Sequence, residues 1–68
     1  NSFAAIEWNP EYLATSINVL DYAGRLILKS EPKNTGYEMI SLSNLSKGQY
    51  IIQVFFESNV INKKIMVQ

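Results

Sequence analysis

The 68-residue chain contains neither cysteine nor histidine. Without cysteine it has no disulfide and no thiolate metal ligand to reinforce a small core. Without histidine it also lacks the most common metal ligand and general base. Catalysis would have to rest on carboxylates or lysines, and the spacing of the six acidic residues shows no pairing typical of acid–base chemistry. We therefore expect no enzyme activity, no metal site and no cofactor.

The chain also lacks an excess of charge and a long hydrophobic run. Six basic residues balance six acidic ones, so no net field attracts nucleic acid, and we expect no nucleic-acid partner. The longest apolar runs, such as residues 54–56 and 65–67, are far shorter than the ~20 residues that span a bilayer. We therefore predict no membrane-spanning segment.

The length and the start of the chain indicate a single domain. A chain of 68 residues holds one small core, and its N-terminus shows no basic region followed by a hydrophobic segment, as an export signal would. Because Asn1 and Ser2 lead directly into an apolar-alternating stretch at Phe3, we expect residues 1–68 to be one domain cut from a longer polypeptide.

What the sequence does contain is a series of short strand-like segments separated by turn residues. Alternating apolar residues predict six strands, and no segment has a convincing helical period. The strands are expected at residues 3–8, 16–22, 25–29, 37–42, 49–57 and 60–67. Residues 30–36 are rich in turn-formers and are predicted to be an exposed loop. We interpret the chain as all-β, a small Ig-like antiparallel β-sandwich. A barrel of the same strands remains open, because alternation defines faces and not closure.

Alternation also predicts which side chains face inward, with Leu45 closing one end. The predicted inward residues are Ile17, Val19, Ile40, Leu42, Tyr50, Ile52, Val54, Ile65 and Val67. Ile51 and Phe55 must face the other way, so the long strand is apolar on both sides. This pattern indicates a central strand or a face covered by something outside the chain, and it would favour a homodimer.

Several residues have both a structural and a functional interpretation. Asp21 precedes a glycine turn, where carboxylates commonly bind the turn backbone, and Gly24 and Gly48 lie in no phosphate-binding pattern. Lys63 and Lys64 suit a solvated edge strand as well as a recognition motif. Tyrosines and a tryptophan could form a carbohydrate platform, but nothing in the sequence places them on one surface, so packing in the core or at an edge is favoured: Trp8, Tyr12, Tyr22, Tyr37 and Tyr50.

Three short stretches, in this order, resemble a known secretion signal. They are Asp21-Tyr-Ala-Gly24-Arg25, then Leu42-Ser-Asn-Leu45-Ser-Lys-Gly48-Gln-Tyr50, then Lys63-Lys64-Ile65 near the C-terminus. Together they resemble the type A C-terminal sorting domain of cargo proteins of the type IX (Por) secretion system in Bacteroidetes. The resemblance extends from about Ile17 to Gln68. The residues that carry it are Asp21, Gly24, Arg25, Leu45, Gly48, Tyr50, Lys63, Lys64 and Ile65.

The resemblance implies a function. After Sec-dependent export to the periplasm, such a domain guides its cargo through the outer-membrane translocon to the cell surface or the medium. A surface sortase then removes the domain and commonly attaches the cargo to anionic lipopolysaccharide. The expected partners are therefore translocon and sortase components. A receptor would add a strand to the terminal edge strand, with Lys63 and Lys64 supplying charge complementarity.

The sequence departs from the family pattern at its N-terminus, and two other functions remain open. The family usually opens with a Pro-Asn-Pro element, and Asn9–Pro10 lies too late to replace it, so we expect that element and the first strand to be absent from residues 1–68. One alternative is a non-cleaved Ig-like adhesion or carbohydrate-binding module of a surface enzyme, marked by clustered exposed aromatic residues. The other is a structural spacer, on which neither glycan binding nor export depends.

Overall fold

All six predicted strands are present, with ends shifted by no more than one or two residues. The computed structural model describes residues 3–33 and 35–68. Asn1 and Ser2, on which the expectation of a longer polypeptide rests, and Asn34 of the predicted loop lie outside the described residues. The strands are β1 (Phe3–Glu7), β2 (Ala14–Asp21), β3 (Leu26–Ser30), β4 (Tyr37–Ser41), β5 (Gly48–Phe56) and β6 (Val60–Val67). The described residues include no helix long and apolar enough to cross a lipid bilayer.

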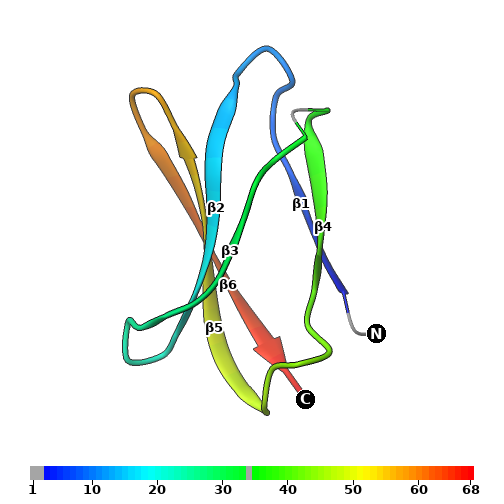
Figure 1. The fold of residues 1–68 in the computed structure, drawn as a ribbon, viewed down its shortest axis with the longest axis vertical. Helices are drawn as coiled ribbons and strands as arrows, with labels where there is room; N and C mark the ends of the chain where they lie inside the picture. The colour runs from blue at the N-terminus through cyan, green and yellow to red at the C-terminus, as the bar shows by residue number, and fades with distance from the viewer. Residues whose placement is uncertain (1–2, 34) are drawn as a thin grey trace.

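The strands form two antiparallel sheets. β1 pairs with β4, and the other four strands are ordered β3-β2-β5-β6. Figure 1 shows the four-stranded sheet on the left and the β1–β4 pair on the right. Because no strand of one sheet pairs with a strand of the other among the described residues, the arrangement is a β-sandwich, as predicted, and not a closed barrel.

The core lies between the two sheets and on one face of β2 and β5. From Tyr50 to Phe55, residues of β5 alternate between buried and partly buried, which is the pattern of a central strand covered fully on one side only. Ile17 and Ile52 are completely inaccessible, and burial of each such side chain contributes about 1.5–3 kcal/mol. The predicted inward residues are confirmed, although Ile65 and Val67 of the edge strand are only partly buried.

Three further side chains are buried that were not predicted to be, and Trp8, which was expected in the core or at an edge, lies in the core. Ile6, Trp8 and Ala14 join the apolar core, and Glu38 on β4 is buried opposite Ile6. The carboxylate of Glu38 accepts a hydrogen bond from the Lys33 amide (3.1 Å) and lies 3.4 Å from the Lys33 ammonium. A buried carboxylate needs such partners, because removing it from water without them is costly.

The prediction for the loop at residues 30–36 is corrected by the structure. This segment was expected to be exposed throughout, yet Gly36 is buried and Pro32 is partly buried. The Gly36 carbonyl accepts a hydrogen bond from the Trp8 amide (2.8 Å), which continues the β1–β4 pairing beyond the strand ends. The loop therefore packs against the sandwich at both Lys33 and Gly36.

Candidate functional site

The turn between β2 and β3 is organised by the side chain of Asp21. Oδ1 of Asp21 accepts hydrogen bonds from the backbone amides of Ala23 and Arg25, both 2.9 Å, and Oδ2 accepts from Nε of Arg25 at 2.9 Å. The backbone closes the same turn, with the Asp21 amide bound to the Arg25 carbonyl and the Gly24 amide bound to the Asp21 carbonyl. Asp21 therefore stabilises the turn, as predicted for a carboxylate at this position.

These contacts set the electrostatics of Asp21. The hydrogen bond from the Arg25 amide is the largest cause that lowers the pKa of the Asp21 carboxyl below its ordinary value, with the Arg25 side chain and the Ala23 amide acting in the same direction. Partial burial opposes the shift. The carboxyl is thus ionised at neutral pH, and the partners of the carboxylate are groups of the same turn.

Gly24 has a positive φ of 90°, a conformation that side chains with a Cβ adopt only with strain. Nothing lies within 4 Å of the position that a Cβ would occupy. The requirement for glycine here is therefore one of backbone conformation and not of space.

The second motif folds as a tyrosine corner, in which a tyrosine hydroxyl binds the backbone a few residues upstream. The hydroxyl of Tyr50 donates to the Ser46 carbonyl at 2.7 Å, while its ring is buried in the core. Leu45 packs against the core cluster, and its amide binds the Leu42 carbonyl at 3.0 Å. Gly48, with a φ of 146°, opens β5. The motif therefore fixes the path of the chain from β4 into β5.

The first two motifs lie side by side. A shallow groove of about 410 Å³ is lined by the β2–β3 turn, including Asp21 and Arg25, and by the segment from Ser46 to Tyr50. Asp21 pairs directly with Tyr50 across the two central strands. Two motifs that are separate in sequence, at residues 21–25 and 42–50, thus form one surface at one end of the four-stranded sheet, the lower end in Figure 1.

The third motif joins this end through strand pairing. Ile65 on β6 pairs with Tyr50, so Asp21, Tyr50 and Ile65 occupy one row across three neighbouring strands. We call the seven motif residues that gather here the motif end: Asp21, Gly24, Arg25, Leu45, Gly48, Tyr50 and Ile65.

Lys63 and Lys64 precede Ile65 on β6 and lie on opposite sides of the sheet. Lys63 pairs with the buried Ile52 and therefore lies on the core-facing side, whereas Lys64 pairs with Ile51 on the outer face. Both lysines are exposed. The structure thus brings seven of the nine predicted residues together and separates the two lysines from each other.

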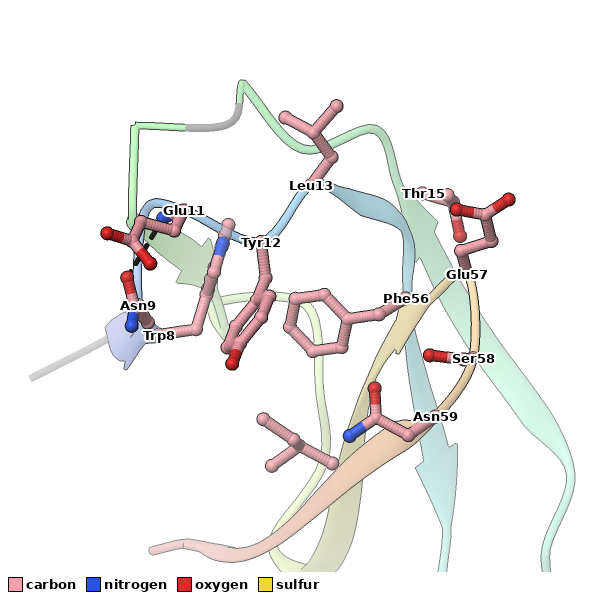
Figure 2. Close-up of a pocket in the computed structure, with 11 residues that line it drawn as sticks. Trp8, Asn9, Glu11, Tyr12, Leu13, Thr15, Phe56, Glu57, Ser58 and Asn59 are labelled. Carbon is pink, nitrogen blue, oxygen red and sulfur yellow. Dashed lines mark hydrogen bonds between the residues drawn. The ribbon is translucent and has the colours of Figure 1, made fainter.

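A second concavity lies at the opposite end of the sandwich (Figure 2). This aromatic cleft, about 1060 Å³, is formed by the β1–β2 connection and the β5–β6 turn. The Phe56 ring meets Trp8 and Tyr12 edge to face, with centroid distances of 6.3 Å in both pairs. Nε1 of Trp8 is buried and has no hydrogen-bond partner among the residues described. Two carboxylates, Glu11 and Glu57, line the cleft, and its lining includes no basic residue within the described part of the chain.

Sequence reasoning missed this cleft for an identifiable reason. Trp8 and Phe56 are 48 positions apart, and their contact depends on the packing of one sheet on the other. The only local signal is that Ile6 and Trp8 lie two residues apart, which in a strand places both on the same, inward side.

Comparison with known proteins gives the same family as the motifs that meet at the motif end. A protein family described as "Secretion system C-terminal sorting domain" matches residues 1–68, the whole chain. No curated protein and no solved structure matches it. The Asp21 turn, the tyrosine corner at Tyr50 and the Ile65 strand therefore fold together within a chain that matches this family along its full length. The chain belongs to the family of C-terminal sorting domains of the type IX (Por) secretion system.

Proposed function

We propose that this domain is a removable address that brings an attached cargo protein to the type IX translocon in the outer membrane. The observation that carries the proposal is the row Asp21–Tyr50–Ile65, which joins all three motifs at one end of a single sheet. The row forms only when β2, β5 and β6 pair, so a receptor that binds this end distinguishes a folded signal from an unfolded chain.

The arrangement suits binding better than catalysis, and we propose that the domain itself is not an enzyme. The Asp21 carboxylate is occupied by its own turn, and Glu38 is bound by Lys33. A recognition signal needs a rigid, accessible surface, and the hydrogen bonds of the Asp21 turn and of Tyr50 provide rigidity without a reactive group.

Family membership also supports our proposal for the finer steps of the route. The cargo first crosses the inner membrane by the Sec pathway, the domain then directs it from the periplasm through the outer membrane, and a surface sortase removes the domain. The cargo is secreted or held at the cell surface, and the host is a member of the Bacteroidetes. These steps rest on family membership, and the exposed side chain of Arg25 at the motif end is accessible to a receptor.

Export of a reporter tests the proposal. A fluorescent protein with an N-terminal Sec signal is fused to this domain, together with any residues that precede it in its parent protein. The fusion is expressed in a type IX-competent bacterium and in a translocon-deficient strain. We expect the reporter outside the cell only in the competent strain. Equal periplasmic retention in both strains would contradict the proposal.

A truncated fusion tests the terminal motif separately. Removing residues 65–68 takes Ile65 from the row that it shares with Tyr50 but leaves the Asp21 turn and the tyrosine corner unchanged. We expect this fusion to stay in the periplasm with its domain still folded. Unchanged export of a folded truncation would show that the terminal motif is not read.

The aromatic cleft supports a second candidate function, glycan binding. Tyr12 and Leu13 are 61% and 69% exposed at its rim, and aromatic rings can stack on the apolar faces of sugars. The two carboxylates accept hydrogen bonds from hydroxyl groups and disfavour anionic ligands. Trp8 is the single tryptophan of the chain, so its fluorescence directly reports occupancy. A saturable shift on titration with neutral oligosaccharides would support this function, and an unchanged spectrum would remove it.

A further inference from the structure

The register of β6 gives its two consecutive lysines different surroundings. Lys63 lies on the core-facing side of the edge strand, on the same side as Ile61 and Ile65, and Lys64 lies on the outer face beside Ile51. Adjacent residues in a strand face opposite sides of the sheet, so a partner that docks on one face contacts only one of these lysines.

Lys63 occupies a position typical of protection against strand addition. β6 is at the end of the sheet order β3-β2-β5-β6, so its outer edge offers unpaired backbone groups to another chain. An inward-pointing charge on an edge strand discourages such pairing, because a second sheet edge added there would bring apolar surface over the ammonium group. Lys63 shares this side with Ile61, which is 44% exposed.

The outer face of the four-stranded sheet has a different pattern. Its direct pairs form a row of three apolar residues that ends at a lysine: Leu26, Leu20, Ile51 and Lys64. A register shift between Val19 and Leu20 brings Leu26 opposite Leu20. The neighbouring row is polar and begins with the other lysine of this face: Lys29, Asn18, Gln53 and Asn62. Leu26 is 55% exposed, and Leu20 and Ile51 are partly buried. These two rows carry two positive charges and no negative charge, although the chain as a whole is neutral.

We propose that this outer face is the surface on which the export machinery docks, and that Lys64, and not Lys63, is its charged contact. The partner that fits is a protein surface with an apolar ridge for Leu26, Leu20 and Ile51 and a carboxylate for Lys64. The proposal rests on the proposed sorting function and assigns its recognition step to one face. Charge complementarity selects an acidic partner and disfavours a basic one.

Two matched pairs of variants in the reporter fusion test this assignment. Lys63→Glu and Lys64→Glu make the same charge change at adjacent exposed positions. Leu26→Thr and Ile61→Thr remove exposed apolar side chains from the outer face and the core-facing side, respectively. We expect the two outer-face variants, Lys64→Glu and Leu26→Thr, to reduce translocon-dependent export about tenfold, which corresponds to the loss of one good contact. Their counterparts should export like the wild type.

The outcomes separate this inference from the proposed function. If the wild-type fusion is not exported in a translocon-dependent way, the sorting function itself fails. If the wild type is exported but Lys63→Glu reduces export as much as Lys64→Glu, docking on the outer face is contradicted. The partner would then add a strand at the β6 edge, which both lysines flank. Equal export by all four variants also overturns the inference. Thermal unfolding of each purified fusion identifies any loss that is due to folding.

Self-association gives an independent readout for Lys63. In the purified fusion, Lys63→Thr removes the inward charge and adds a residue that favours strands, so we expect a concentration-dependent dimer in light scattering. Lys64→Thr makes the same substitution on the other face, and this variant should remain as monomeric as the wild type. The same oligomeric state in both variants would show that Lys63 does not protect the edge.

Discussion

The two ends of the sandwich are built in contrasting ways. At the motif end, polar groups bind backbone atoms within four residues of their own position: Asp21 binds Ala23 and Arg25, and Tyr50 binds Ser46. At the aromatic cleft, rings from distant parts of the chain pack edge to face, and the Nε1 of Trp8 has no partner among the described residues. The motif end is thus specified by local hydrogen bonds, and the cleft by packing of the two sheets.

This comparison predicts that the cleft is more important for stability, with Trp8 its most sensitive residue. Replacing Trp8 with alanine empties a buried site of the core and should reduce the free energy of unfolding by about 3–5 kcal/mol. Denaturation followed by circular dichroism measures the loss. Leu13→Ala, on the exposed rim of the same cleft, is the control and should change stability by less than about 0.5 kcal/mol. Similar losses in the two variants would contradict the assignment of Trp8 to the core.

At the motif end, a backbone effect should be the largest. Gly24→Ala places a Cβ at a φ of 90°, which costs roughly 1–2 kcal/mol, although the Cβ itself meets no neighbouring atom. Thermal unfolding of the variant measures this cost. Gly24→Asn should lose less, because asparagine tolerates positive φ better than alanine does. A neutral Gly24→Ala would show that the turn relaxes.

The tyrosine corner should contribute a smaller amount through one hydrogen bond. Tyr50→Phe removes the hydroxyl that donates to the Ser46 carbonyl and keeps the buried ring, so we expect a loss of about 1 kcal/mol. In a domain of this size the melting temperature should fall by about 4–8 °C. Tyr22→Phe, at a residue that is 78% exposed, should leave it unchanged. An unaltered melting temperature in Tyr50→Phe would contradict the role of this hydrogen bond.

The smallest effect should depend on pH and come from Asp21. Its pKa in the folded state is lowered from the ordinary value of 3.8, so the ionised form is favoured by folding. Its stabilisation is therefore present above about pH 4 and is lost as the pH falls through the lowered folded-state value. Asp21→Asn should be less stable than the wild type near neutral pH, and the difference should shrink in acid. A difference that does not vary with pH would show that the ionised carboxylate contributes nothing to the turn.

The strands and the separate turns of the motif end could be predicted because their signals are local. Alternation in residues 16–22 and 49–57 defined the inward side of both central strands, and Asp21 with Gly24 defined the turn between β2 and β3. The pairings of β2 with β5 and of β1 with β4 join strands that are not consecutive, and no local pattern specifies them. The row Asp21–Tyr50–Ile65 depends on the first of these pairings, so its convergence was invisible in the sequence.

Burial of Glu38, and the residue that covers Trp8, could not be predicted for a related reason. A glutamate in a short strand is expected to face solvent, and only the approach of Lys33 from the preceding loop makes its burial acceptable. Trp8 follows the end of β1 and is covered by Phe56 from a strand at the other end of the chain. Both depend on how distant segments pack together.

The central claim is that the motif end makes this domain a sorting signal that is removed after use. The most direct measurement is the intact mass of the secreted reporter fusion, compared between the type IX-competent and the translocon-deficient strain. The account predicts that the reporter appears outside only the competent cells. Its polypeptide should be lighter than that of the uncleaved fusion by at least the 7.7 kDa of this chain. A reporter that stays in the periplasm of both strains, or that leaves the cell with the domain still attached, would contradict it.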